Sequence, residues 1–189
     1  MFKKIIVTLI YRNRQLMYFY LSIGTNINPE KNAVRIIKNL CHHFGMLTLY
    51  PFVYTKPELI SSSSIFLNGL AIIESKLDDK ELKNILNSIE VKLGRNRNDP
   101  LKSTKNRPAD IDILLQADKH HLALFDTFTD QYIKACLPPN TPVDLSVYGL
   151  PTHQGAATIH LDNTAGQISI IENKFDCLVH REESTFIWQ

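Results

Sequence analysis

The sequence is short of cysteine and glycine, and its charges of the two signs nearly cancel. Its three cysteines, at positions 41, 136 and 177, are widely spaced and form no C-x-x-C pair, which argues against a disulfide scaffold and against a thiolate zinc site. Seven glycines and nine prolines in 189 residues exclude a collagen-like or Gly/Pro-rich low-complexity chain. The formal charge of +2 is too small for a surface that holds nucleic acid throughout, so any electrostatic function has to be local.

Long hydrophobic runs are also missing. No apolar segment approaches the ~20 residues that a membrane-spanning helix needs. The first residues look like a signal peptide only briefly, because Arg12 and Arg14 interrupt the apolar run and no small-residue cleavage site follows. We therefore expect a cytoplasmic protein with no membrane partner. Met17 precedes the first recognisable element and is an alternative start, so residues 1–16 are expected to be an N-terminal extension or a start-site artefact.

The sequence does contain two successive strand–helix–strand patterns. Apolar, β-favouring runs predict strands over residues 18–23, 46–54, 66–74 and 109–115. Pro51 interrupts the second of these, which indicates an edge position or a bulge. Apolar residues at helical spacing predict one helix from Pro29 to the stop signal Gly45, and another from the capping box of Asp78 and Glu81 to Gly94. This order is typical of an α+β fold, the ferredoxin-like α/β sandwich, in which helices pack on an antiparallel sheet.

The stretch from residue 95 to residue 112 carries the most chemistry. Five cations lie within thirteen residues, and they are Arg95, Arg97, Lys102, Lys105 and Arg107. Asp110 and Asp112 follow in an apolar strand, so their side chains share one face, roughly 7 Å apart. Two carboxylates at this spacing repel each other unless a cation lies between them, and Mg²⁺ binds carboxylates together with phosphate oxygens. Because guanidinium groups bind the same phosphates, the stretch predicts polyphosphate chemistry.

Other interpretations of this stretch remain open. A basic loop alone is most often solvated surface, and an acidic pair alone often flanks the exposed edge of a sheet. A ferredoxin-like nucleic-acid-binding module is a further alternative, but Asp110 and Asp112 would repel a phosphate backbone, so we expect no nucleic-acid partner. The chain has no phosphate-binding loop of the form G-x-x-x-x-G-K-[ST], so ATP binding would have to use other residues.

Five segments resemble, in order and spacing, the motifs of one enzyme family. They are Leu21–Asn26 (LSIGTN), Tyr54–Pro57 (YTKP), Phe66–Asn68 (FLN), Ile89–Arg97 (IEVKLGRNR) and Arg107–Leu114 (RPADIDIL). The chain resembles the 6-hydroxymethyl-7,8-dihydropterin pyrophosphokinases of folate biosynthesis. The resemblance implies an enzyme that transfers diphosphate from ATP to the hydroxymethyl group of a reduced pterin and releases AMP.

The same resemblance implies roles for individual residues. Asp110 and Asp112 would hold two Mg²⁺ ions, and they would form the catalytic set together with three arginines. The implied ATP-binding residues are Glu90, Arg95, Arg97 and Arg107, of which the arginines are also the catalytic ones. The implied pterin-binding residues are Thr55, Pro57, Phe66 and Asn68. ATP and the pterin would be the small-molecule partners of a monomeric enzyme.

Two of the implied pterin residues also have a physical argument of their own. The carboxamide of Asn68 supplies one hydrogen-bond donor and one acceptor, which matches the alternating groups along a pterin edge. An amide in the middle of a strand also needs partners if it is buried. Phe66 offers a flat aromatic surface for stacking, although a phenylalanine in a strand is more often part of the core.

The second half of the chain departs from the family's pattern. Residues 117–189 contain no His-Pro segment followed by an arginine and a phenylalanine, and their single arginine is Arg181. We expect one pyrophosphokinase-like domain over residues 17–189, with residues 117–189 diverged and with strands at 157–161 and 168–171. The departure leaves a second interpretation open, a catalytically degenerate paralogue that binds pterin or nucleotide without turnover.

Overall fold

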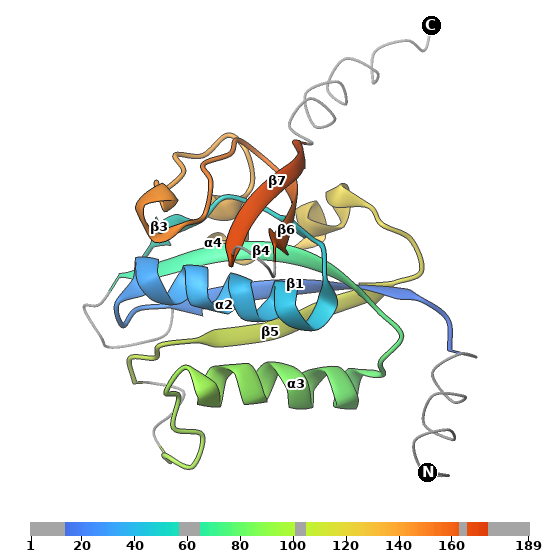
Figure 1. Ribbon diagram of the computed structural model, residues 1–189, viewed down its shortest axis with the longest axis horizontal. Coiled ribbons are helices and arrows are strands. Elements are labelled where there is room, and N and C mark those ends of the chain that lie inside the picture. Colours follow the sequence, from blue (N-terminus) through green and yellow to red (C-terminus); the bar gives the residue numbers. More distant parts are fainter. Residues whose placement is uncertain (1–13, 57–64, 101–104, 163–165, 174–189) are drawn as a thin grey trace, which may run out of the picture.

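The computed structural model describes residues 14–56, 65–100, 105–162 and 166–173. Pro57, Lys102 and Cys177 lie outside these residues, as does most of the expected N-terminal extension. The strands of the described part join one seven-stranded sheet, with helices packed on it (Figure 1). The boundary expected at residue 16 stays a prediction.

The sheet is antiparallel and has β5 at one edge. Its order runs from β5 (Asp110–Ala117) through β1 (Met17–Thr25) and β4 (Phe66–Ser75) to β2 (Leu47–Leu49) and β3 (Val53–Thr55), which both pair with β4. The hairpin of β6 (Ala157–Asp162) and β7 (Gln167–Asn173) extends the sheet beyond β2. The order of the first four positions is that of a ferredoxin-like sheet, because the last strand of the double strand–helix–strand unit pairs with the first.

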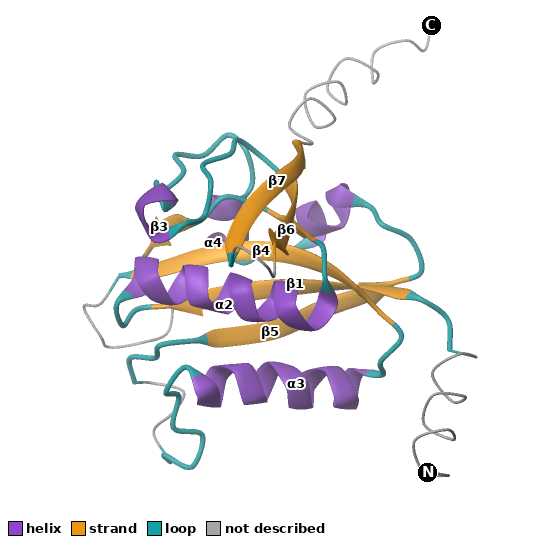
Figure 2. Cartoon of the chain, in the orientation of Figure 1, coloured by secondary structure: helices purple, strands orange, loops and turns teal. Residues whose placement is uncertain are grey.

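Two long helices pack on one face of this sheet (Figure 2). They are α2 (Pro29–Phe44), which lies against β1 and β4, and α3 (Asp79–Lys92), which lies against β5. The opposite face carries α4 (Gln131–Cys136) and the 3-10 helix η1 (Leu122–Thr127). A short 3-10 turn, η2 (Ser146–Tyr148), comes later in the chain and contacts α2. The α+β, ferredoxin-like sandwich expected from the sequence is confirmed.

The capping box expected at the start of α3 is also present. The Asp78 carboxylate accepts a hydrogen bond from the Glu81 amide at 2.9 Å, and the Glu81 carboxylate accepts one from the Asp78 amide at 3.0 Å. These bonds satisfy two amides that a helix start otherwise leaves without partners. The box therefore sets where α3 begins, and so which of its residues face β5.

Alternation along β1 divides the core into two layers. Phe19, Leu21 and Ile23 are buried against the layer of α2 and α3. Tyr20 points to the other side, where its ring packs edge-on against Phe125 and its hydroxyl accepts a hydrogen bond from the His121 amide at 2.8 Å. Both faces of the central strand are thus filled, which makes β1 a rigid support for the strands beside it.

Two parts of the sequence prediction can be compared directly with these elements. The strand predicted over residues 46–54, with an interruption at Pro51, is present as two short strands, β2 and β3, because Pro51 has no amide hydrogen to donate to a ladder. The strands predicted at 157–161 and 168–171 are confirmed as β6 and β7. Within the described residues, we find no helix with the length and apolar character that crossing a membrane requires.

Candidate functional site

Four of the predicted site residues lie on the face of the sheet opposite α2 and α3, where β1 ends and β5 begins; they are Phe66, Asn68, Asp110 and Asp112. In the strand register, Gly24 of β1 stands between Asp110 of β5 and Asn68 of β4. A Cβ atom placed on Gly24 would lie 2.9 Å from Asn68 Oδ1, 3.8 Å from Phe66 Cδ1 and 3.9 Å from Asp110 Cβ. The glycine therefore leaves open the space at which an amide, an aromatic ring and a carboxylate converge.

The amide group in this space has a fixed orientation. Asn68 is 8% exposed, and its Nδ2 donates a hydrogen bond to Thr55 Oγ1 at 2.6 Å. This bond leaves Oδ1 on the side of Gly24, as the short Cβ distance shows. Phe66, which pairs with Thr55 in the strand register, is buried to the same extent. Of the predicted pterin residues, Thr55, Phe66 and Asn68 are thus brought together, and Pro57 lies outside the described residues.

Arg107 connects this group to the acidic residues of β5. Its backbone amide donates to Asn26 Oδ1 at 2.6 Å, and its carbonyl accepts from the Asn26 amide at 3.1 Å. Its guanidinium group is hydrogen-bonded to Asp110 and lies 5.7 Å from the centre of the Phe66 ring. Asn26 therefore fixes the backbone at a point from which one arginine reaches both the carboxylate and the ring.

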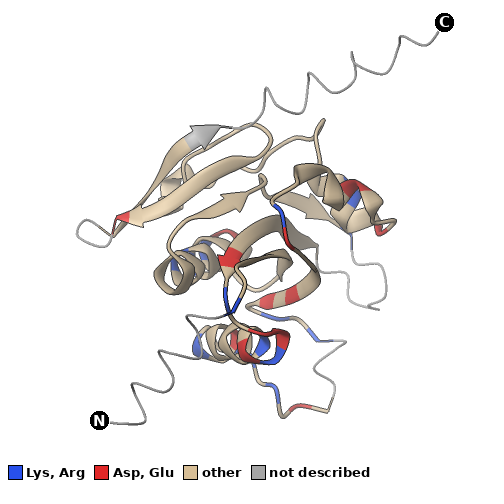
Figure 3. Cartoon of the chain, turned by 90° about the vertical axis from the view of Figure 1, so that its right-hand side faces the viewer, with Lys and Arg blue, Asp and Glu red and all other residues tan. Residues whose placement is uncertain are grey.

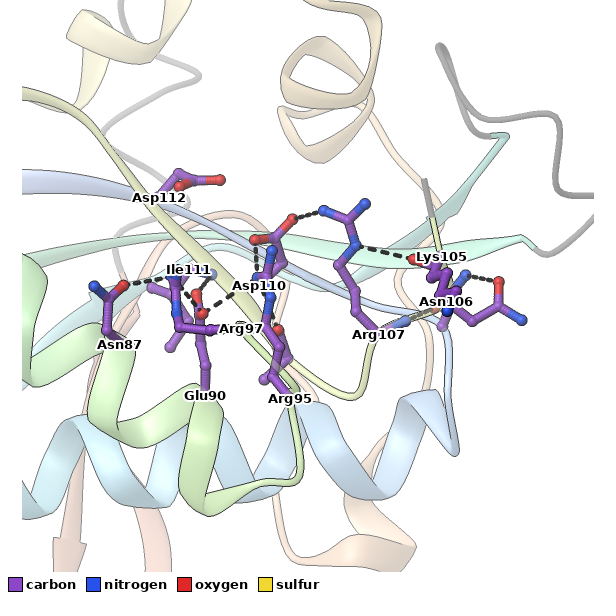
Figure 4. Close-up of polar contacts among 12 residues, drawn as sticks. Asn87, Glu90, Arg95, Arg97, Lys105, Asn106, Arg107, Asp110, Ile111 and Asp112 are labelled. Carbon is purple, nitrogen blue, oxygen red and sulfur yellow. Dashed lines mark hydrogen bonds and ion pairs between the residues drawn. The ribbon is translucent and has the colours of Figure 1, made fainter. Parts of the chain in front are cut away.

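The carboxylate of Glu90, a residue of α3, is paired with the other two arginines, Arg95 and Arg97. Its side chain is completely buried, its Oε1 accepts from the Ile111 amide at 2.8 Å, and its Oε2 lies 2.7 Å from Arg97 Nη2 and 3.2 Å from Arg95 Nη1 (Figure 4). Burial raises the pKa of Glu90, while the Ile111 amide and the two arginines act in the opposite direction. The predicted role of Glu90 in ATP binding stays a prediction, and the contacts of its buried side chain are those with Ile111, Arg95 and Arg97.

The two arginines have different further partners, Arg95 on β5 and Arg97 on α3. Arg95 donates to the Ala109 carbonyl at 3.1 Å and pairs with Asp110, whose other oxygen pairs with Arg107. Arg97 also donates to Asn87 of α3. Asp110 thus receives two guanidinium groups, which are only 10% and 12% exposed. In Figure 3, acidic positions of the sheet lie next to basic positions of the neighbouring loops.

Asp112 is more exposed and has a different partner. Its side chain is 57% exposed, and its Oδ1 lies 2.7 Å from Nζ of Lys83, a residue of α3. The register pairs Asp112 with Ser22 and Asp110 with Gly24, so both carboxylates lie on the same face, as their spacing predicts. Their donor set is two hard carboxylates on one strand, which fits Mg²⁺ and does not fit a soft metal.

Charge balance shows what kind of ligand the site suits. The carboxylates of Glu90, Asp110 and Asp112 stand against the cations Lys83, Arg95, Arg97 and Arg107. The cations outnumber the carboxylates, and the guanidinium groups are held by backbone or buried partners. The arrangement suits a polyanion that arrives together with a divalent cation.

The comparisons with known proteins point the same way. A sequence model of the family described as 7,8-dihydro-6-hydroxymethylpterin-pyrophosphokinase (HPPK) matches residues 20–144. The chain belongs to this family. Two curated relatives, from two strains of Porphyromonas gingivalis, are both named 2-amino-4-hydroxy-6-hydroxymethyldihydropteridine pyrophosphokinase. Each is 33% identical to this chain over 100 residues, which cover 52% of this chain and 68% of the relative.

The pyrophosphokinase family and the enzyme class that the motifs predict are thereby confirmed. The HPPK match continues past the last motif, which ends at Leu114, through η1 and α4 to residue 144. Site residues that sequence reasoning missed are Lys83, Asn26 and Asn87. Asn26 could have been found, because it closes the Gly-Thr-Asn turn. Lys83 and Asn87 leave no sequence signal, since each is an ordinary polar residue of an amphipathic helix.

Proposed function

We propose that this family member transfers the β,γ-diphosphate of ATP to the hydroxymethyl group of 6-hydroxymethyl-7,8-dihydropterin, releases AMP and requires Mg²⁺. One observation carries the proposal: two groups of side chains lie next to each other on one face of the sheet. Phe66 and Asn68 form a ring-and-amide surface, and Asp110 with its arginines lies directly beside it. A pterin on the first group would present its hydroxymethyl group to a polyphosphate on the second.

At the pterin end, the hydrogen bond to Thr55 fixes the amide of Asn68 in an orientation that suits binding of the pterin edge. Thr55 accepts one amide hydrogen, so Oδ1 is left to accept from a ring N–H and the second amide hydrogen is left to donate. The Phe66 ring supplies the stacking surface, and the absence of a side chain at Gly24 keeps the approach open. These residues would read the donor–acceptor edge of the pterin and orient its hydroxymethyl group.

At the phosphate end, the arginines would exchange partners. In the structure, Arg95 and Arg107 are paired with Asp110. When they bind phosphate oxygens instead, Asp110 would become available to hold Mg²⁺ together with Asp112, whose own partner is Lys83. When bound, Mg²⁺ would neutralise phosphate charge and lower the pKa of the attacking hydroxyl group. Glu90 would keep Arg95 and Arg97 aimed at the phosphates throughout, because its own contacts are buried.

The reaction balances without a covalent enzyme intermediate. The hydroxymethyl oxygen forms a bond to the β-phosphorus of ATP, and the bond from that phosphorus to the oxygen bridging to the α-phosphate breaks. AMP leaves with the bridging oxygen, and the hydroxyl proton passes to solvent. Arg95, Arg97 and Arg107 would stabilise the charge on the transferred and leaving groups, which is the main requirement of phosphoryl transfer.

The direct test is to incubate the protein with ATP, Mg²⁺ and the pterin and to measure AMP, with ADP as the contrasting product. We expect AMP to form, and Asp112→Ala to lower its rate at least about a hundredfold, because a metal contributes several kcal/mol. Asp118→Ala, an exposed carboxylate just after β5, is the matched control. An unchanged rate in Asp112→Ala would refute the metal role. Binding of both substrates by the wild type without AMP would favour the degenerate paralogue.

The proposal includes a monomeric enzyme in the cytoplasm. The side chains that form the site all come from one chain, so a second copy is not needed to complete it. The buried thiols of Cys41 and Cys136 are unpaired, which suits a reducing compartment. The oligomeric state can be measured by sedimentation of the full chain at assay concentration.

A further inference from the structure

Lys83 is attached to the edge of the proposed metal site by the backbone as well as by a carboxylate. Its Nζ donates to the Ile111 carbonyl at 3.0 Å and to Asp112 Oδ1 at 2.7 Å. The Ile111 carbonyl belongs to the residue between the two aspartates. The ammonium group is therefore held next to Asp112 by a contact that does not depend on the carboxylate.

The two aspartates are balanced by cations of different kinds. Asp110 is paired with arginines that a nucleotide's phosphates can bind instead, so nucleotide binding itself would release that carboxylate. Asp112 is paired with a lysine that comes from α3, and 35% of that lysine side chain is exposed. An ammonium group 2.7 Å from Oδ1 occupies a position at which a divalent cation would meet strong repulsion.

We infer that Lys83 is a resident counter-ion that competes with the divalent cation for Asp112, and so sets the metal affinity of the nucleotide-free protein. The inference rests on the proposed function, because it takes Asp112 as a metal ligand. A cation that binds Asp112 displaces the ammonium group from Oδ1, while the Ile111 carbonyl keeps Lys83 at the site. The lysine thereby disfavours metal binding in the absence of nucleotide.

The size of the effect follows from the exposure of the pair. Ion pairs between partly exposed side chains change an equilibrium by about two- to fivefold. Removal of the ammonium group by Lys83→Met should therefore tighten metal binding by about this factor. Methionine keeps the helix propensity and much of the length of the lysine stem, so α3 is preserved. Lys80→Met is the matched control, because it removes an exposed lysine one turn earlier on the same helix.

The experiment measures the dissociation constant of Mn²⁺, a hard-donor probe for the Mg²⁺ site, by electron paramagnetic resonance of the nucleotide-free full chain. The variants are Lys83→Met, Asp112→Asn, the double variant and Lys80→Met, each checked by thermal unfolding. We expect Lys83→Met to bind Mn²⁺ about two- to fivefold more tightly, and Asp112→Asn to bind it more weakly. In the Asp112→Asn background, Lys83→Met should have no effect, and Lys80→Met should match the wild type.

The possible failures are distinguishable. If Asp112→Asn leaves Mn²⁺ binding unchanged, Asp112 is not a metal ligand, and both the proposed metal site and this inference are refuted. If Asp112→Asn weakens binding but Lys83→Met does not tighten it, only the role of Lys83 is overturned. Equal tightening in Lys80→Met would show that general charge, and not the contact with Asp112, is responsible, and would also overturn the inference.

Discussion

Substitution of Asp110 by asparagine separates the two functions that this carboxylate has in the proposed site. In the structure Asp110 is the common partner of Arg95 and Arg107, and in the proposed reaction it is a metal ligand. Asparagine has nearly the same shape but no charge. We expect Asp110→Asn to lose Mg²⁺-dependent AMP formation and, at the same time, to bind ATP more tightly when no metal is present.

The magnitude follows from the two ion pairs that metal-free ATP has to break in the wild type. The side chains are 10%, 12% and 21% exposed, so each pair is worth about 1 kcal/mol, the upper value for pairs that keep some contact with water. Two such pairs amount to about 2 kcal/mol. At 1.4 kcal/mol for each factor of ten, the affinity for metal-free ATP should rise about thirtyfold.

The assay is isothermal titration calorimetry of ATP in the presence of a chelator, at low ionic strength to limit screening. Asp112→Asn removes the same charge from the same face but leaves both arginines paired, and we expect its affinity for metal-free ATP to change much less. Circular dichroism and the melting temperature show whether each variant is folded. A folded Asp110→Asn variant with unchanged or weaker affinity for metal-free ATP would refute the partner exchange.

Two further predictions concern the core. Gly69→Ala should lower the free energy of unfolding by about 1–3 kcal/mol, because the new Cβ would lie 2.8 Å from Phe52 Cε1 in the buried core. Chemical denaturation measures this loss, and the additional substitution Phe52→Leu should recover part of it. Burial raises the pKa of Cys41 and Cys136 to about 12, so at pH 8 only about one thiol in ten thousand is a thiolate, and neither should be alkylated in the native protein. Mass spectrometry after alkylation locates any label, and rapid labelling of either cysteine would contradict the burial.

Local patterns were sufficient to predict most elements of this fold. The capping box at Asp78 and Glu81 set the start of α3, and the apolar runs located β1, β4 and β5. The shared face of Asp110 and Asp112 also followed from sequence, since alternation is a property of any strand. These features depend on neighbours within a few residues, and such neighbours are visible in the chain itself.

Only the tertiary structure decided how the site residues act on one another. That Gly24 lies between Asp110 and Asn68 depends on the register of three strands, which no local pattern contains. The burial of Glu90 behind two arginines and the approach of Lys83 to Asp112 depend on how α3 packs against β5. The residue types were readable from the sequence, but their partners come from segments far apart in it, and the fold alone determines those distances.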